Sequence, residues 1–423
     1  MSLPYFREFG WNPEILTVDI RCSDMAIDPL LTESVPPDVP VHYVKALSKK
    51  WTGKIGLGSI ALRSLPYLDR KGNQLLKDKA FDLVYFSTTQ YPVCVLGRFW
   101  KKRFGIPYVI DVQDPWRSDY YLGKPKNERP PKFWFSYRLD KFLEPLAMNR
   151  VDGLLAVSHG YLETLADRYP NCAKVPQQTI PFGAFDKDFE IAKKHLVHQP
   201  SVLEKKEGRV NVVYIGRGGR DMQGAVSLLF RSFRECLAKE PALYGRLHFH
   251  FIGTSYASAG KGTATVLPLA DAFGISSYVT EITDRLPFYQ TLNTLADADA
   301  LFVPGSNDPQ YTASKIYPYV LAQKPLLAIF HPLSSVVDFL RLSKAGTVLC
   351  FDQDESTIHH AVANFLYNVV SHTAGTPRLD LTVIEQYSAR EMTKRQCALF
   401  DEVGQFIKNF ADARVSVSLS SPS

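Results

Sequence analysis

The sequence lacks most features of secreted, membrane-spanning or metal-dependent proteins. Its six cysteines are far apart and include no CxxC pair, which argues against a disulfide framework or a zinc site. No apolar run reaches the ~18 residues needed to cross a bilayer. The opening residues, MSLPYFREFGWNPE, lack the apolar core of a signal peptide. We therefore expect a cytoplasmic protein with reduced thiols.

Several catalytic and cofactor signatures are also missing. The chain has no G-x-S-x-G, catalytic-cysteine or Walker pattern, and no lysine signature for pyridoxal phosphate. Asp297 and Asp299 form a D-x-D that ends an expected helix, whereas the metal-binding form of this motif follows a strand. His248 and His250 share one strand face without a third ligand, so packing is the simpler interpretation. We expect no metal and no resident cofactor.

What the sequence does contain is a core large enough for two α/β domains. It has 423 residues, of which 45% are hydrophobic and 22% charged, as in ordinary globular proteins. Short β-branched runs alternate with longer helical stretches, which predicts doubly wound parallel sheets. The first set of expected strands is 14–20, 41–46, 81–87, 107–113 and 152–158. The second set is 211–216, 247–253, 277–282, 300–305, 326–331 and 347–351.

The polar stretch 187–209 separates the two sets of strands and predicts a linker. We therefore expect domains at 1–186 and 210–382, a last amphipathic helix at 383–411 and a disordered Ser-rich tail at 412–423. In such folds ligands bind beyond the carboxyl ends of the strands, here expected in a cleft between the domains.

The net positive charge of the chain comes entirely from its first half. Residues 1–199 carry 28 Lys+Arg against 22 Asp+Glu, and residues 200–423 carry 21 of each. The densest segment is 96–105, LGRFWKKRFG, in which aromatic and basic residues alternate. This segment predicts either contact with anionic lipid or a phosphorylated acceptor, or simply a solvated amphipathic helix. No nucleic-acid-binding motif accompanies the charge, so we expect no nucleic-acid partner.

Two segments of the second half are suited to phosphate binding. In YIGRGGRDMQG, a strand ends at Gly216 and a glycine-rich turn with Gly218 leads into a helix, although the third glycine of a dinucleotide fingerprint is missing. Arg217 and Arg220 could pair with a diphosphate, or the segment is an ordinary strand–helix turn. In TASKIYPYVLAQKP, we expect Ser314 to cap a helix whose first turn holds Lys315 and Pro318.

The first half has one comparable cluster of polar residues. PYVIDVQDPWRSDYY places Asp111, Gln113, Asp114, Trp116 and Arg117 where a strand ends, which is where an α/β fold forms its site. The alternative is an Asp–Pro helix cap with the tryptophan packed below it. His159, in AVSHGYLETL, stands at another strand-to-helix turn and is either a catalytic or a polar turn residue.

Seven segments in order resemble one protein family over nearly the whole chain. They are YFREFGWNPEILTV, PYVIDVQDPW, VDGLLAVSHGYLETL, TIPFGAFDKDF, VVYIGRG, SKIYPYVLAQKPLLAIF and EQYSAREMTKRQCALFDEV. The family is that of the GT-B, family-4-type glycosyltransferases, which transfer a sugar from a nucleotide donor with retention. The resemblance implies two Rossmann-like domains and a metal-independent retaining hexosyltransferase. Its co-substrate would be a nucleoside-diphosphate sugar, and its place would be polysaccharide or glycolipid biosynthesis.

The family's donor-site residues carry over incompletely. Arg217 matches the basic residue that contacts the diphosphate, but its partner lysine falls on Gln223. The family's E-x7-E pair falls on Gln310 and Pro318, so the glutamate that holds the ribose is a proline here. The full set of implied donor-binding residues is Gly216, Arg217, Gly218, Arg220, Gln223, Gln310, Ser314, Lys315, Ile316 and Pro318.

On the acceptor side, the histidine that many members have near the reaction centre falls on Gln113, next to the carboxylate of Asp114. We therefore name Gln113 and Asp114 as candidate catalytic residues, with Asp111, Trp116, Arg117 and His159 near the acceptor. The basic first domain predicts an anionic or lipid-linked glycan acceptor and peripheral contact with the inner face of the membrane through residues 96–105.

Two departures keep a second hypothesis open. The chain begins within what resembles the family's first helix, which suggests a missing first strand and glycine-rich loop. The donor-site substitutions point in the same direction. The alternative is a glycosyltransferase-like protein that has lost its chemistry and acts as a binding or assembly partner. A GT-B epimerase or phosphorylase is a more distant option.

Overall fold

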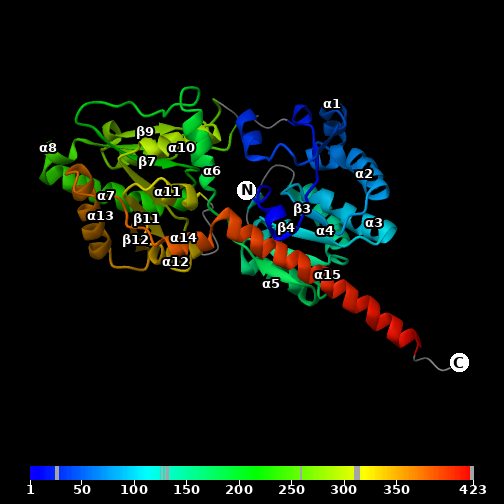
Figure 1. Cartoon of the computed structure of the whole chain (residues 1–423). Helices are drawn as coiled ribbons and strands as arrows, with labels where there is room; N and C mark the ends of the chain where they lie inside the picture. The colour runs from blue at the N-terminus through cyan, green and yellow to red at the C-terminus, as the bar shows by residue number, and fades with distance from the viewer. Residues whose placement is uncertain are drawn as a thin grey trace. The chain divides into compact units, whose positions relative to one another are not determined.

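The computed structural model describes residues 1–23, 28–123, 125–126, 129, 133–257, 260–308 and 315–419. The chain divides into two compact units. Unit 1 comprises Met1–Ile27, Val35–Pro181 and Arg390–Ser423, and unit 2 comprises Asp28–Ser34 and Phe182–Ala389. Both units are built from parallel strands and helices (Figure 1).

Unit 1 holds two parallel sheets. One pairs β1 (Ile15–Val18) with β2 (Val41–Val44). The other has the order β3-β4-β5-β6, formed by β3 (Val84–Ser87), β4 (Tyr108–Val112), β5 (Gly153–Ala156) and β6 (Gln177–Thr179). The central strands β4 and β5 are almost fully buried because helices cover both of their faces.

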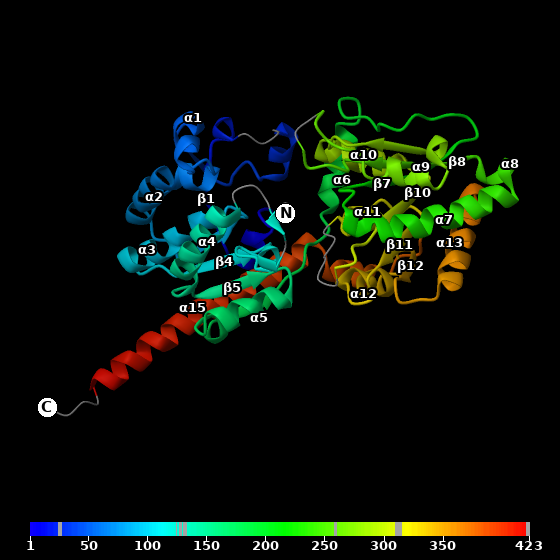
Figure 2. The ribbon, with the colours of Figure 1, turned by 180° about the vertical axis from the view of Figure 1, so that it is seen from behind.

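The helices of unit 1 follow the strands in alternation. They are α1 (Lys49–Thr52), α2 (Ile60–Asp78), α3 (Val95–Phe104), α4 (Phe133–Met148) and α5 (His159–Arg168). Tyr108 and Ile110 of β4 face the core beneath α3 and α4. Val109, one position between them, faces the opposite side, where it packs with Phe400 and Val403 of α15 (Ala389–Leu419). Figure 2 shows α15 running along the sheet beside α5.

Unit 2 is a doubly wound sheet in the order β12-β11-β10-β7-β8-β9, with all strands parallel. Its strands are β7 (Val210–Ile215), β8 (Leu247–Ile252), β9 (Val279–Ile282), β10 (Ala300–Pro304), β11 (Leu326–Phe330) and β12 (Thr347–Cys350). The strand order reverses between β7 and β10. In this class of fold, such a reversal opens a crevice at the carboxyl ends of the strands.

Nine helices accompany this sheet in the described part of unit 2. They are α6 (Asp186–Lys194), α7 (Gln223–Lys239), α8 (Pro241–Tyr244), α9 (Leu267–Ala272), α10 (Phe288–Asp297), α11 (Ile316–Leu321), α12 (Ser335–Leu342), α13 (Glu355–Val370) and α14 (Leu381–Gln386). One continuous core joins the strands to helices α7 to α14, and α6 packs against α10 in a separate cluster.

The two units do not follow the boundaries expected from the sequence. Residues 187–209, expected to link two domains, belong to unit 2 and contain most of α6. Asp28–Ser34 also belongs to unit 2, although unit 1 flanks it in the sequence. In place of one helix at 383–411, the structure has α14 and then α15. The latter continues to Leu419, through most of the tail expected to be disordered.

Candidate functional site

The loops that follow β7 and β10 meet where the strand order of unit 2 reverses. The backbone N–H of Asn307, after β10, donates to the carbonyl of Asp221, after β7, at 3.1 Å. Tyr319 of α11 binds both backbone groups of Ile215, the last residue of β7: its hydroxyl accepts from the N–H at 2.6 Å and donates to the carbonyl at 3.1 Å. These bonds fix the glycine-rich turn 216–219 and α11 against the same strand.

Lys315 reaches into the space above Gly216. A Cβ at position 216 would lie only 2.3 Å from the Lys315 Nζ, so the missing side chain of this glycine makes room for the ammonium group. Lys315 Nζ donates to the hydroxyl of Tyr214 at 2.5 Å and lies 4.6 Å from the centre of its ring. That hydroxyl donates to the carbonyl of Arg217 at 2.8 Å, which connects the lysine to the turn.

Two arginines add to the positive charge around Lys315. Burial, and to a smaller extent the charges of Arg217 and Arg285, lower the pKa of Lys315 to about 7, against the opposite effect of Asp221. Arg285 follows β9, and its guanidinium stacks 4.4 Å from the ring centre of Tyr256. The site therefore disfavours the third cation unless an anion is present.

Asp221 holds Arg217 in a bidentate ion pair. The two terminal nitrogens of Arg217 donate to the two carboxylate oxygens of Asp221 at 2.8 and 2.7 Å. Burial opposes ionisation of Asp221, but hydrogen bonds from Arg217 and Ser306 keep its pKa below the usual value. An incoming diphosphate would therefore compete with one carboxylate for Arg217.

The remaining donor-side candidates are placed less favourably. Arg220 is exposed, and Gln223 is the first residue of α7. Ile316 is buried in the core of unit 2, so its role there is packing. Gln310 and Ser314 lie outside the described residues. The structure thus brings together Gly216, Arg217 and Lys315, out of the longer predicted set.

Pro318 is accommodated within α11. The helix begins at Ile316, and Pro318 is its third residue, where a backbone N–H has no intrahelical acceptor. Its carbonyl still accepts from the N–H of Ala322 at 3.0 Å. The helix expected around the proline is therefore present, and the substitution removes a side-chain function without breaking the helix.

In unit 1, Asp111 and Gln113 interact at the carboxyl end of β4. Gln113 Nε2 donates to Asp111 Oδ2 at 2.8 Å and to Ser87 Oγ at 3.2 Å. Tyr85 also donates to Asp111 Oδ2, at 3.1 Å. Burial raises the pKa of Asp111, and hydrogen bonds from Gln113, Tyr85 and Ser87 oppose that effect. This pair forms a polar cluster anchored to β3 and β4.

The hydroxyl of Tyr91 binds both backbone groups of Asp114. The hydroxyl of Tyr91 accepts from the N–H of Asp114 at 2.8 Å and donates to its carbonyl. The side chain of Asp114 is exposed, yet partial desolvation raises its pKa. A fixed, accessible carboxylate with a raised pKa is suited to accept a proton.

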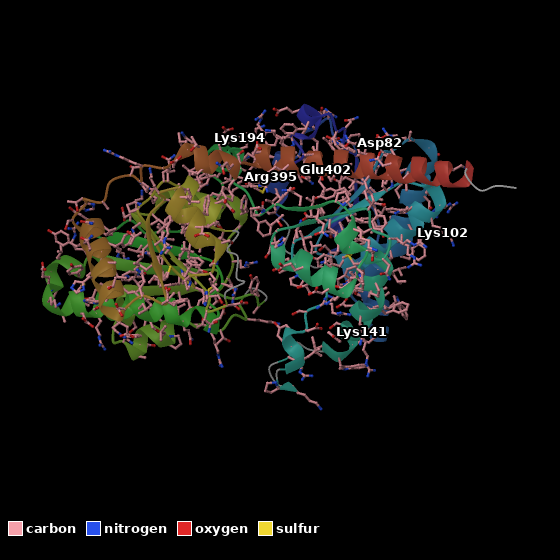
Figure 3. All side chains as sticks on the ribbon, turned by 90° about the horizontal axis from the view of Figure 1, so that it is seen from below. Asp82, Lys102, Lys141, Lys194, Arg395 and Glu402 are labelled. Carbon is pink, nitrogen blue, oxygen red and sulfur yellow. The ribbon has the colours of Figure 1, made fainter. Side chains whose placement is uncertain are left out.

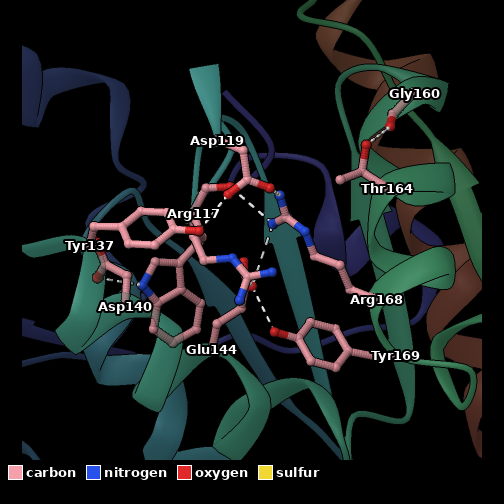
Figure 4. Close-up of polar contacts among 10 residues, drawn as sticks. Arg117, Asp119, Tyr137, Asp140, Glu144, Gly160, Thr164, Arg168 and Tyr169 are labelled. Carbon is pink, nitrogen blue, oxygen red and sulfur yellow. Dashed lines mark hydrogen bonds and ion pairs between the residues drawn. The ribbon is translucent and has the colours of Figure 1, made fainter. Parts of the chain in front are cut away.

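Trp116 and Arg117 instead point into unit 1. Trp116 is 8% exposed, stacks on Tyr91 and donates from Nε1 to Asp140 Oδ1 at 3.0 Å. Arg117 Nε lies 3.6 Å from Oε2 of Glu144, a carboxylate that Tyr169 and Arg168 also approach (Figure 4). These contacts favour the packing interpretation for both residues over contact with an acceptor.

His159 and the two strand histidines also have local partners. His159, the first residue of α5, is exposed and lies 3.5 Å from Glu163, one turn further along. His250 Nε2 lies 2.9 Å from Asn211 Oδ1, and His248 Nε2 lies 2.8 Å from Thr280 Oγ1. Burial lowers the pKa of both strand histidines to about 4, so they are neutral packing residues near neutral pH.

Three residues that matter at this site were not identified from the sequence. Tyr214 binds Lys315, and Asp221 binds Arg217. The charge of Arg285 lowers the pKa of Lys315. Arg285 follows an expected strand, and a basic residue at that position could have been predicted as a site residue. Tyr214 lies inside a strand, where its role depends on a lysine about a hundred residues away and leaves no local pattern.

Comparisons with known proteins agree with this architecture. Residues 5–183 match the family model described as glycosyl transferase 4-like domain. No curated protein sequence matches the chain significantly. Within the described residues, no helix is long and apolar enough to span a bilayer, and no group of three or more His, Cys, Asp or Glu side chains is arranged to hold a metal.

Similar solved structures were found, and one of them exceeds a TM-score of 0.5. A UDP-forming α,α-trehalose-phosphate synthase from Burkholderia xenovorans is similar at a TM-score of 0.51 and 11% identity, over 81% of this chain and 78% of that one. A sucrose-phosphate synthase from Thermosynechococcus elongatus gives a TM-score of 0.49 at 13% identity, over 97% and 91% of the two chains. The similarity to the trehalose-phosphate synthase structure shows that this chain has the two-domain GT-B fold.

Proposed function

We propose that the protein transfers a sugar, with retention, from a nucleoside-diphosphate sugar to a glycan acceptor. One observation supports the donor side most directly: at the carboxyl ends of the strands, the charges of Arg217 and Arg285 both act against the buried ammonium of Lys315, and Asp221, which binds Arg217, partly opposes them. A diphosphate would relieve the repulsion among these cations. The glycosyl transferase 4-like domain and the GT-B fold support the reaction class.

In this proposal the cations stabilise the departing nucleoside diphosphate. Charge that develops on the leaving phosphate would be met by Lys315 and by the two guanidinium groups, which is commonly the largest contribution to catalysis. The lysine takes the place of the second basic residue that is absent at Gln223. Asp114 and Gln113 would face the acceptor hydroxyl, with Asp114 as the proton acceptor.

The acceptor belongs to the same proposal. The basic charge of the first half of the chain supports an anionic or lipid-linked glycan. In the segment 96–105, however, some of the basic side chains are already paired with other residues of unit 1. Lys101 Nζ lies 2.5 Å from Asp152 Oδ1, and Arg103 Nη1 donates to Asn73 Oδ1 at 3.1 Å. Phe99 and Lys102 stay exposed, so α3 alone offers only a narrow face to a membrane.

The donor proposal is tested by calorimetric titration with UDP, GDP, ADP and a nucleotide sugar. We expect Lys315→Met and Arg285→Ala each to weaken the affinity by about 1–3 kcal/mol, the contribution of a hydrogen bond to a charged group. Lys344→Met, at an exposed lysine of unit 2, is the matched control. The absence of any binding at millimolar nucleotide would reject the donor proposal.

The pH dependence of binding gives a second test. Because the pKa of Lys315 is about 7 in the unliganded site, binding an anion must be accompanied by uptake of a proton above that pH. We expect the affinity for a nucleotide sugar, whose phosphates do not titrate near neutrality, to fall as the pH rises above 7. In Lys315→Met the affinity should no longer depend on pH in this range.

One observation favours the alternative, a catalytically inactive binding or assembly partner. Asp221 occupies both terminal nitrogens of Arg217, and Pro318 offers no group to a ribose. In that case Asp221→Asn, which releases Arg217, would produce no nucleotide binding either. Binding that appears only in Asp221→Asn would mean that the fold keeps a donor site that the carboxylate closes.

A further inference from the structure

The excess positive charge is concentrated in a limited part of unit 1. Residues 45–150 carry 21 Lys+Arg and 9 Asp+Glu, twice the net charge of the whole chain. Among the described residues of this range, two segments each combine at least two large, exposed apolar side chains with cations. They are residues 45–57 and the outer side of α4.

Residues 45–57, KALSKKWTGKIGL, contain four lysines and no carboxylate. Trp51, in α1, is 74% exposed, and Leu47 and Leu57 are 42% and 37% exposed. Lys54 Nζ lies 5.4 Å from the centre of the Trp51 ring, so a cation borders the largest apolar side chain of the segment. An exposed tryptophan among lysines is a composition typical of a membrane interface.

The outer side of α4 has the same composition. Trp134, Arg138, Lys141 and Phe142 follow at helical spacing and are all exposed, the two aromatic residues at 66% each. Figure 3 shows Lys141 at the periphery of unit 1. The two carboxylates of α4 do not reach this side: Asp140 accepts from Trp116, and Glu144 is 1% exposed.

These two segments are in contact. Gly56 lies so close to Phe135, in the first turn of α4, that a Cβ at Gly56 would be 3.3 Å from its ring. Phe135 in turn packs edge-on against Trp134, with ring centres 5.9 Å apart. Residues 45–57 and the outer side of α4 therefore form one surface, here called the α1–α4 face. Its lysines and arginines number six and are Lys45, Lys49, Lys50, Lys54, Arg138 and Lys141.

We propose that the α1–α4 face docks the protein onto an anionic lipid bilayer. Trp51, Trp134 and Phe142 would enter the headgroup region, and the lysines and arginines would contact lipid phosphates. Each cation near an anionic surface contributes about fivefold in affinity at low salt. The aromatic side chains explain why the partner is a bilayer and not a soluble polyanion, because only a bilayer offers apolar depth beneath its charge. The proposal is independent of the donor site in unit 2.

The test is cosedimentation of the full chain with vesicles of phosphatidylcholine, with and without phosphatidylglycerol. We expect binding only to the anionic vesicles, weakened at high salt. Lys49→Glu/Lys50→Glu/Lys54→Glu should reduce it by at least tenfold, whereas Lys239→Glu/Lys261→Glu/Lys344→Glu, with the same charge change on exposed lysines of unit 2, should reduce it much less.

The aromatic contribution has its own matched pair. Trp51→Ser/Phe142→Ser should lower the binding roughly tenfold, and Leu333→Ser, at a leucine of unit 2 that is 76% exposed, should leave it unchanged. All these side chains are exposed, so circular dichroism should show every variant folded. The proposal is overturned if the chain does not sediment with anionic vesicles. It is also overturned if the aromatic pair binds like wild type, or if the chain binds random duplex DNA in preference to vesicles.

Discussion

Replacing Lys315 with methionine is expected to stabilise unit 2 while weakening its affinity for a diphosphate. Burial of the ammonium, together with the charges of Arg217 and Arg285, lowers its pKa from 10.5 to about 7. Methionine keeps much of the side-chain volume and removes the charge. The substitution should then remove the free-energy cost of burying the charged lysine in the folded protein. It should also remove the ammonium group that we propose for phosphate binding.

The magnitude follows from the difference in pKa. Between pH 10.5 and pH 7 the unfolded chain holds a proton that the folded chain releases, so folding is destabilised progressively as the pH falls through this window. Each unit corresponds to about 1.4 kcal/mol, which gives an upper limit of about 5 kcal/mol at pH 7 and below. The lost hydrogen bond to Tyr214 offsets about 1 kcal/mol of the gain. We expect a net stabilisation of about 2–4 kcal/mol at pH 7.

The distribution of tryptophan makes the assay specific. All five tryptophans (Trp11, Trp51, Trp100, Trp116 and Trp134) belong to unit 1, so their fluorescence in urea reports the unfolding of that unit alone. Hydrogen exchange of the amides in β7 reports unit 2. Lys315→Met should slow exchange in β7 near pH 7 and leave the fluorescence transition unchanged.

Two results would refute the reasoning. If Lys315→Met leaves exchange in β7 unchanged, the lysine is not destabilised in the folded protein, and the repulsion that supports the donor site is absent. If the variant gains stability equally at pH 7 and near pH 10.5, the gain comes from packing and not from charge. Lys344→Met, at an exposed position, should change neither observable.

Three further predictions follow from other contacts. Asp221→Asn should free Arg217 and tighten nucleotide binding severalfold in calorimetry, and a weaker affinity would mean that the ion pair positions the arginine. Because the pKa of His250 is about 4, unit 2 should lose stability as the pH falls from 6.5 to 4, by at most about 3 kcal/mol, with a shallower fall in His250→Asn. Val403→Ala should lower the stability of unit 1 by about 2 kcal/mol in the fluorescence assay, since this side chain is fully buried; no change would place α15 outside the core.

The strands were predictable because parallel strands covered on both faces are continuous apolar runs. Every expected strand is present, and the ends agree within a few residues. β6 was not predicted, since its sequence, QQT, is polar and its side chains are only half-buried at the edge of the sheet. The unit boundaries were harder to predict from the sequence, because Asp28–Ser34 joins unit 2 through contacts with residues far along the chain.

The candidate site was predictable where the backbone itself carries the signal. The glycine that follows an apolar strand predicted the turn at Gly216. The polar residues at the end of β4 predicted that Asp111 and Gln113 belong to a site. Side-chain pairing gave no such signal. Trp116 was predicted to lie near the acceptor or to pack in the core. Its partner Asp140 lies on a later helix, so only the folded chain shows that the two meet.

The return of α15 to unit 1 has a consequence for the order of folding. Gly153 in β5 leaves a space that Val403 fills, since a Cβ there would lie 2.6 Å from the valine. The core on that side of β4 and β5 is therefore complete only when the last long helix has been synthesised. Unit 2 has all of its strands earlier, so during translation the second unit in the sequence can close before the first. Until then, the N-terminal segment around Phe6 covers only part of this apolar face of the unit 1 sheet, so a chaperone that recognises exposed apolar segments could bind the nascent chain there.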